Sequence, residues 1–344
     1  MKINFPCRPS FRAALAISVA VVSLSGCSSA RNVLSSETAY VAPEKMRLRS
    51  STAEAARSVG EVKSGDQVTI TERKNEGNTA WANVSGPGGA TGWIEMRYLV
   101  KQEIVDSTNK IAEELRGVPT QAIGKSKATL KLRLTPDRNT EDNVAFPLPA
   151  GTTLEIVARE RRPRPEKLEA VAKPATAQGN PTAAPTPSGP KYDDWFKVRL
   201  PNYSIVPAGW IYGGSVELEV PGEISFFLST GRRIVGWQKI GAVTDDTNQS
   251  HDSFLVVEKN NFDADERGDF DRVKVLAYDP KRREYGTPFR EDLLGRFPVS
   301  AKMEGSRGQF SLTVLDKAGQ ASKVDYAIEI LEGGKAKVTR QLPK

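Results

Sequence analysis

Cysteine and histidine are scarce in this sequence, which has two cysteines and one histidine among 344 residues. Zinc sites need several Cys and His ligands, so such a small number of these residues argues against a zinc site. The histidine, His251, stands between Ser250 and Asp252, but the groups of a catalytic triad must converge in space rather than in sequence. We therefore expect His251 to lie alone in a surface loop, and we expect no enzymatic activity, no metal and no cofactor.

A strong excess of one charge is also missing, since 49 Lys and Arg residues are set against 42 Asp and Glu residues. Binding of nucleic acid requires a concentrated basic face, so we expect no nucleic-acid partner. Long apolar runs are missing too. A membrane-spanning helix needs about 20 apolar residues, and the uncharged run Ala13–Leu24 is shorter than that.

The N-terminus nevertheless has the pattern of an export signal. Lys2, Arg8 and Arg12 precede the uncharged run Ala13–Leu24, which is the order found in secretory signal peptides. The segment Leu24-Ser25-Gly26-Cys27 that follows resembles the lipobox of bacterial lipoproteins. The resemblance implies that residues 1–26 are a lipoprotein signal peptide, cleaved before Cys27, and that Cys27 carries the lipid, diacylglycerol and palmitate.

This resemblance also implies a location. Cys7 is lost with the leader, so Cys27 is the only thiol left and no disulfide forms within the mature chain. The membrane becomes a partner through the N-terminal lipid, and the protein is expected in the cell envelope. Ser28 and Ser29 follow without an aspartate, which favours the outer membrane if the cell is Gram-negative. The small polar residues 27–36 are predicted to be a tether.

Most of the remaining chain has the pattern of β-strands. Short β-branched or aromatic runs are bounded by Gly, Pro, Asp or Asn, as in Gln67–Thr71, Thr153–Val157 and Phe310–Leu315. The exception is Glu103–Arg116, where apolar residues recur at helical spacing before Gly117. We predict a helical linker at residues 103–128.

Four sequence blocks recur in the same order on both sides of this linker. The matched pairs are Met46–Arg49 with Leu130–Arg133, Lys63–Ile70 with Pro149–Ile156, Trp81–Val84 with Trp195–Val198, and Gly92–Ile94 with Gly209–Ile211. Together these blocks resemble bacterial SH3-like (SH3b) domains. The resemblance implies two small SH3-like barrels, at residues 37–102 and 129–221. Glycines at the matched positions fit turns or close approaches of the backbone.

The second copy differs from the first by a long insertion, residues 163–190. This segment is rich in Pro, Ala and Thr, and it is predicted to be disordered because it has too little apolar surface to offset its ordering entropy. Basic residues precede and begin it, namely Arg159, Arg161, Arg162, Arg164 and Lys167. We favour a solvated loop for them over contact with an anionic polymer or lipid headgroup.

Residues 222–344 are predicted to be a third, C-terminal β domain. Alternation of apolar and polar residues, as in Val324, Tyr326 and Ile328, is typical of half-buried antiparallel strands. The fold class is therefore mostly β, with two SH3-like barrels followed by an antiparallel β-sandwich or half-open barrel. The acidic stretch Asp263–Asp271 leaves calcium binding open, although an acidic hairpin turn is the favoured interpretation.

Three functions are compatible with these features. The leading one is a non-catalytic envelope lipoprotein whose SH3-like modules bind peptidoglycan or an envelope protein. The predicted ligand-binding residues are Trp81, Tyr98, Tyr192 and Trp195, with exposed aromatic rings. The alternatives are a structural or assembly lipoprotein that binds partners through its C-terminal domain, and an accessory or catalytic part of a cell-wall hydrolase.

Overall fold

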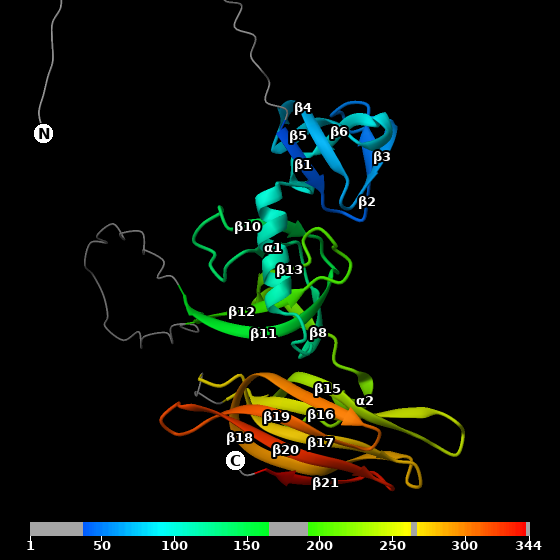
Figure 1. The fold of residues 1–344 in the computed structure, drawn as a ribbon, viewed down its shortest axis with the longest axis vertical. Coiled ribbons are helices and arrows are strands. Elements are labelled where there is room, and N and C mark those ends of the chain that lie inside the picture. The colour runs from blue at the N-terminus through cyan, green and yellow to red at the C-terminus, as the bar shows by residue number, and fades with distance from the viewer. Residues whose placement is uncertain (1–36, 165–191, 263–266, 342–344) are drawn as a thin grey trace, which may run out of the picture. The chain divides into compact units, whose positions relative to one another are not determined.

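The computed structural model describes residues 37–164, 192–262 and 267–341. Within these ranges, three antiparallel sheets of seven strands each follow one another along the chain (Figure 1). The predicted mostly β fold is therefore confirmed. The predicted signal peptide, Cys27, the tether and residues 165–191 of the insertion region lie outside the described residues.

The first sheet covers residues 37–100. Its strands are β1 (Glu37–Val41), β2 (Lys45–Arg49), β3 (Ser58–Lys63), β4 (Gln67–Glu76), β5 (Thr79–Ser85), β6 (Thr91–Glu95) and β7 (Leu99–Val100), with the 3-10 turns η1 (Pro87–Gly89) and η2 (Met96–Tyr98). They are arranged in the order β3-β2-β6-β5-β4-β1-β7. Val68 is buried in its small core and Ile70 packs against that core, as their alternation predicts.

The second sheet covers residues 122–218. It contains β8 (Ala122–Ser126), β9 (Leu130–Arg133), β10 (Val144–Leu148), β11 (Thr153–Pro163), β12 (Tyr192–Arg199), β13 (Ala208–Tyr212) and β14 (Val216–Leu218), with the 3-10 turn η3 (Gly213–Ser215). Its order is β10-β9-β13-β12-β11-β8-β14. This is the order of the first sheet when the strands are matched one to one along the chain. Leu154 and Ile156 are buried in its core, as predicted.

One predicted boundary of this sheet is wrong. β8 pairs with β11 and β14, so the second sheet begins within residues 103–128, which the sequence assigns to the linker. The strand has few β-branched residues and contains Gly124, so it lacks a strong strand signal. Gly124 lies there because a Cβ atom would come within 2.8 Å of Val216 Cγ1 on the neighbouring strand.

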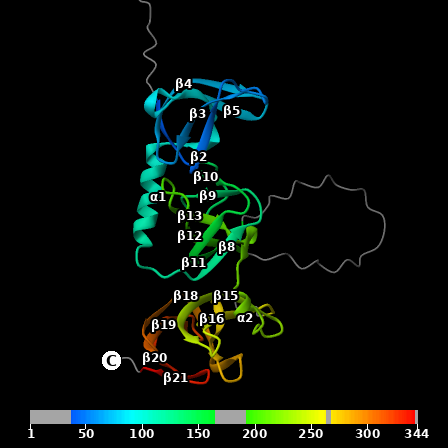
Figure 2. The ribbon, with the colours of Figure 1, turned by 90° about the vertical axis from the view of Figure 1, so that its right-hand side faces the viewer.

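The predicted helix between the sheets is confirmed as α1 (Gln102–Glu114). Figure 2 shows it beside the second sheet, near β13. Ile111 packs together with Val157 and Ala208 of that sheet, and the Thr108 hydroxyl lies 3.4 Å from the Ile205 carbonyl oxygen. The helix therefore belongs to the packing of the second sheet and is more than a spacer.

Glycines occupy the sharp turns and close approaches that the repeat predicts. Gly65 and Gly151 have φ of +88° and +80°, a left-handed conformation that favours glycine. A Cβ atom on Gly92 would lie 2.9 Å from the Arg49 carbonyl oxygen, and one on Gly209 would lie 2.9 Å from the corresponding oxygen of Arg133. The same steric requirement thus occurs at the same place in both sheets.

Gly209→Ala is therefore expected to destabilise the protein by about 1–3 kcal/mol, the usual range for overpacking. The added methyl group would also lie 2.7 Å from Leu132 Cδ1 in the core. The matched control is Gly222→Ala, because nothing lies within 4 Å of a Cβ atom there. Chemical denaturation of both variants measures the difference. Equal stability of the two variants would contradict the packing described here.

The third sheet follows the short helix α2 (Gly222–Ser225). Its strands are β15 (Arg232–Thr244), β16 (Ser250–Asn260), β17 (Phe270–Asp279), β18 (Glu284–Glu304), β19 (Arg307–Leu315), β20 (Ala321–Leu331) and β21 (Lys335–Arg340). They pair in chain order, and the sheet curls so that β18 also contacts β15 and β21. Of the two predicted architectures, the half-open barrel is the one observed.

Both faces of this sheet are covered in part. Leu255 and Val257 point into the main core, whereas Phe254 and Val256 pack with Ile224 of α2 on the opposite face. The centre of strand β16, Phe254–Val257, is therefore a continuous apolar run, because successive side chains there are buried on opposite faces of the sheet.

Residues 36–344 form one compact unit, and Gln121 connects its second and third sheets. The pairing of β18 with β19 is interrupted between Arg296 and Ser300, which leaves the backbone groups of Val299 without strand partners. The Gln121 side chain donates to the Val299 carbonyl at 3.0 Å and accepts from the Val299 N–H at 2.8 Å. An amide side chain thus replaces the missing strand at a β-bulge.

Candidate functional site

The predicted exposure of Trp81 and Trp195 is wrong. Trp81 is 6% exposed and Trp195 is 2% exposed. Both rings lie on the outer side of their strands, since the neighbouring residues Ala82 and Phe196 face the cores. They are buried because other parts of the chain cover them.

In the first sheet, the cover comes from β2 and the loop that follows it. The Arg49 guanidinium lies 5.2 Å from the Trp81 ring centroid, and it donates to the carbonyl of Ala53 in that loop at 2.6 Å. Lys74, directly opposite Trp81, donates to Thr52 at 3.0 Å. In the second sheet, Tyr212 packs edge-on against Trp195 with centroids 6.1 Å apart. Trp81 therefore lies under the loop after β2, Trp195 lies against the neighbouring strand β13, and neither offers an open ring face.

The two predicted tyrosines do not join these tryptophans in a shared surface. Tyr98 is half-buried and packs against the cores of the first and second sheets. Tyr192 is 43% exposed, but it lies three residues before Trp195 in β12, and side chains at odd spacing point to opposite faces of a strand. The four predicted residues are thus not one aromatic platform.

A different pair of tryptophans is partly exposed at matched positions. Trp93 of β6 and Trp210 of β13 are half-buried, and each lies opposite an arginine, Arg49 or Arg133. Their neighbours Ile94 and Ile211 point into the cores instead. The Lys197 ammonium lies 5.5 Å from the Trp210 ring centroid, which is within the range of a cation–π contact.

His251 is part of strand β16, so its predicted place in a surface loop is wrong. Its Nε2 lies 2.9 Å from an Asp245 carboxylate oxygen, and its ring stacks on Tyr278 with centroids 3.6 Å apart. Hydrogen bonds from Thr247, above all, and from His251 hold the pKa of Asp245 well below its ordinary value. This cluster ties the β15–β16 turn to the sheet.

The predicted acidic stretch is described only in part, since residues 263–266 lie outside the described ranges. Asp271 forms an ion pair with Arg232, and Asp269 accepts the Phe297 N–H at 2.9 Å. Among the described residues, no group of three or more His, Cys, Asp and Glu side chains is placed to hold a metal ion. In the same part of the chain, no helix has both the length and the apolar character needed to cross a membrane.

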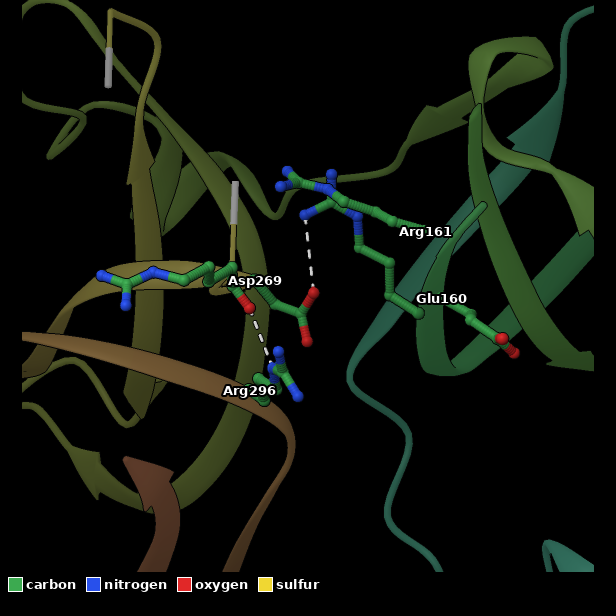
Figure 3. Close-up of a pocket in the computed structure, with 6 residues that line it drawn as sticks. Glu160, Arg161, Asp269 and Arg296 are labelled. Carbon is green, nitrogen blue, oxygen red and sulfur yellow. Dashed lines mark hydrogen bonds and ion pairs between the residues drawn. The ribbon is translucent and has the colours of Figure 1, made fainter. Parts of the chain in front are cut away.

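Arginines gather where β11 of the second sheet faces the third sheet. A cavity of about 240 Å³ is lined by Arg159, Glu160, Arg161, Arg267, Asp269 and Arg296, and Figure 3 shows that Arg161 points toward the Asp269 side whereas Glu160 points away. Glu160 instead pairs with Arg162 at 2.6 Å. An adjoining cavity of about 210 Å³ shares Arg159 and adds Arg233 and Asp194. We call these two cavities together the arginine pocket.

Arg159 is the central side chain of the arginine pocket. It is 5% exposed, pairs with Asp194 at 2.7 Å and lies 3.7 Å from an Asp269 oxygen. Its Nε is buried and has no hydrogen-bond partner in the described structure. The predicted solvated loop is therefore wrong for Arg159, because β11 continues to Pro163 and carries this arginine into a buried position.

The pKa values of the charged groups around Arg159 are shifted by burial and by the charges of their neighbours. Burial raises the pKa of the Asp269 carboxyl above its ordinary value. Burial and the positive charge of Arg159 lower the pKa of Arg233. Burial opposes the charged form of Asp194, but the guanidinium groups of Arg159 and Arg161 together bring the pKa of Asp194 below its ordinary value. Asp194 is thus the carboxylate that most firmly compensates these arginines.

Comparison with known families identifies one part of the chain. Residues 44–100 match the family described as the bacterial SH3 domain, and the first sheet is therefore a bacterial SH3 domain. No curated protein matches the chain.

Proposed function

We propose that this protein is a non-catalytic, lipid-anchored binding protein of the cell envelope, whose SH3 modules hold peptidoglycan or an envelope protein. The observation that carries the proposal is the bacterial SH3 domain at residues 44–100, a type of module that generally binds cell-wall material or proteins. The lipobox-like segment ending at Cys27 supports anchoring by lipid. Ser28 and Ser29, which follow without an aspartate, favour the outer membrane if the cell is Gram-negative.

The second sheet is proposed to be a second SH3-like module. Its strand order repeats that of the first sheet, and Gly209 repeats the close approach of Gly92. Two weak modules on one chain gain avidity when both reach the same polymer, because the second binding event becomes intramolecular. Peptidoglycan is a repeating polymer, so a duplicated module suits it.

Trp93 and Trp210 are the proposed contact residues of these modules. Their rings are partly exposed at matched positions, and a large flat ring offers apolar area to a sugar or peptide. At Trp210 the Lys197 ammonium adds a positive charge beside the ring. Trp81 and Trp195 are too deeply buried to serve in this way.

Binding of the full mature chain to purified peptidoglycan sacculi tests the proposal. Trp93→Ala and Trp210→Ala are each expected to weaken binding by about 1–3 kcal/mol, as for an aromatic anchor, and the double variant should lose more. Phe226→Ala is the matched control, because Phe226 is 88% exposed but lies in the C-terminal domain. Sacculus binding that the double variant retains in full would refute these contact residues, and absence of binding by the unmodified chain would refute peptidoglycan as ligand.

A second candidate function is assembly through the C-terminal domain. Phe226 and Phe262 are 88% and 85% exposed, although large apolar side chains are usually buried. If a protein partner docks there, Phe226→Ala should weaken that complex while sacculus binding is unchanged, as co-purification with the full chain would measure.

A further inference from the structure

The two modules carry different side chains beside their matched tryptophans. In the first module, Trp93 of β6 lies opposite Asn83 of β5, and Asn83 lies opposite Glu72 of β4. Side chains that lie directly opposite each other in an antiparallel sheet share one face. The matched row of the second module is made up of Trp210, Lys197 and Ala158. An amide and a carboxylate therefore accompany the first tryptophan, whereas an ammonium group and a methyl group accompany the second.

Helix α1 covers this face of the second module. Ile111 of α1 packs together with Val157 and Ala208, which are both 0% exposed. At the end of the helix, the Glu114 carboxylate accepts a hydrogen bond from the Lys197 ammonium at 2.7 Å. A segment of the same chain therefore already occupies the surface beside the second row.

The first module leaves the matched surface open. Thr71, at the β-bulge of β4, and Thr91, just before Gly92, take the places of Val157 and Ala208. Both threonines are exposed. Their hydroxyl groups interrupt the apolar surface on which a helix packs, since burying an unpaired hydroxyl costs free energy. This surface of the first module is therefore suited to a polar ligand from solution.

A sugar ring fits the chemistry of the first row. The Trp93 ring is half-buried and presents part of a flat apolar surface, on which the C–H face of a sugar can lie. The Asn83 amide both donates and accepts hydrogen bonds, and the Glu72 carboxylate accepts them, as a rim of sugar hydroxyl groups requires. The same carboxylate repels an anionic ligand. Arg49, on the other side of Trp93, is engaged with the Ala53 carbonyl at 2.6 Å. A neutral ligand rich in hydroxyl groups is therefore favoured.

We propose that the row of Trp93, Asn83 and Glu72 binds a neutral glycan strand, and that the covered row of the second module does not. This inference rests on the proposed function, because it selects glycan from the ligands proposed for Trp93. The contact proposed for Trp210 is then with another part of the wall polymer. The repeat thus gives two modules with different tasks, since the first recognises sugar and the second holds α1.

Calorimetric titration of the full chain with a soluble N-acetylglucosamine oligosaccharide, which is neutral and carries no peptide, tests the proposal. Trp93→Ala is expected to weaken binding roughly tenfold or more, as for an aromatic anchor. Asn83→Ala and Glu72→Gln are each expected to weaken it roughly threefold to tenfold, because each removes or weakens a hydrogen bond. The matched controls are Trp210→Ala and Lys197→Ala, which change the same row of the second module and should bind like the unmodified chain.

The variants of the first row differ in how much they disturb the fold. Glu72 is exposed, so Glu72→Gln should unfold at the same temperature as the unmodified chain. If thermal unfolding shows that Trp93→Ala does not fold, Glu72→Gln and Asn83→Ala still decide the question. Failure of the oligosaccharide to bind the unmodified chain, or equal affinity for all variants, would overturn the glycan site. A loss of affinity in Trp210→Ala as large as that in Trp93→Ala would overturn the division of tasks between the modules.

Binding of the same proteins to purified sacculi separates this inference from the proposed function. Sacculus binding without oligosaccharide binding would overturn the glycan site but leave the peptidoglycan-binding function in place. Oligosaccharide binding through Trp93 without sacculus binding would support the glycan site and overturn peptidoglycan as its source. A soluble stem peptide with free carboxylates should not displace the oligosaccharide, because the Glu72 carboxylate repels it, and displacement would overturn the assignment to glycan.

Discussion

Cys27→Ala is expected to abolish incorporation of a fatty-acid analogue and to move the protein from the membrane fraction to the soluble fraction. Cys27 would be the only thiol left after removal of the proposed leader, so no other residue of that chain could accept the lipid through sulfur. Several acyl chains anchor a protein stably, whereas none of the described helices can replace them as a membrane span.

The second cysteine provides a matched control for this experiment. Cys7 lies in the proposed leader, so Cys7→Ala should leave labelling and fractionation unchanged. Labelling that persists in Cys27→Ala would end the lipoprotein interpretation. Labelling lost in both variants would place the defect in export rather than in acylation.

The repeat made the first two sheets largely predictable from the sequence. Positive φ at Gly65 and Gly151 and close approach at Gly92 and Gly209 are local requirements, and local requirements leave a local sequence signal. The helix α1 was predictable for the same reason, since its buried residues recur at helical spacing.

The arginine pocket was not predictable, because its residues meet only through tertiary contacts. Arg159 and Asp269 are separated by more than a hundred positions in the sequence and approach within 3.7 Å. Arg159 in isolation looks like one member of a basic run, and such runs are usually solvated. Gln121 likewise carries no signal, although it completes the bulge of a strand far along the chain.

The tryptophans show how a correct strand prediction can accompany a wrong prediction of exposure. Alternation places Trp81 and Trp195 on the outer faces of their strands, away from the cores. Whether an outer face is open depends on which other side chains lie over it, and here Arg49 lies over the Trp81 ring and Tyr212 packs against the Trp195 ring. The alternation of apolar and polar residues predicts which face of the sheet a side chain lies on, but it does not predict whether other residues cover that face.

This burial changes what mutation of these tryptophans should do. Trp195→Ala is expected to destabilise the protein by about 3–5 kcal/mol, the usual cost of removing a fully buried large aromatic side chain. The lost packing includes the edge contact with Tyr212, whose ring is also covered by the Arg138 guanidinium at 5.4 Å. The loop that carries Arg138 should therefore loosen as well.

Trp210→Ala is the control for this last prediction, because it removes the same side chain from a half-buried position one strand away. It should cost clearly less stability, since less apolar area and less packing are lost. Three sheets need not unfold together, so hydrogen exchange of the amides in β11–β13 is the decisive measurement. Protection there should fall much further in Trp195→Ala than in Trp210→Ala, while the amides of β1–β7 stay protected. A Trp195→Ala protein with unchanged protection that binds sacculi more weakly would return Trp195 to the role of a contact residue, since only an accessible ring can affect binding without affecting the fold.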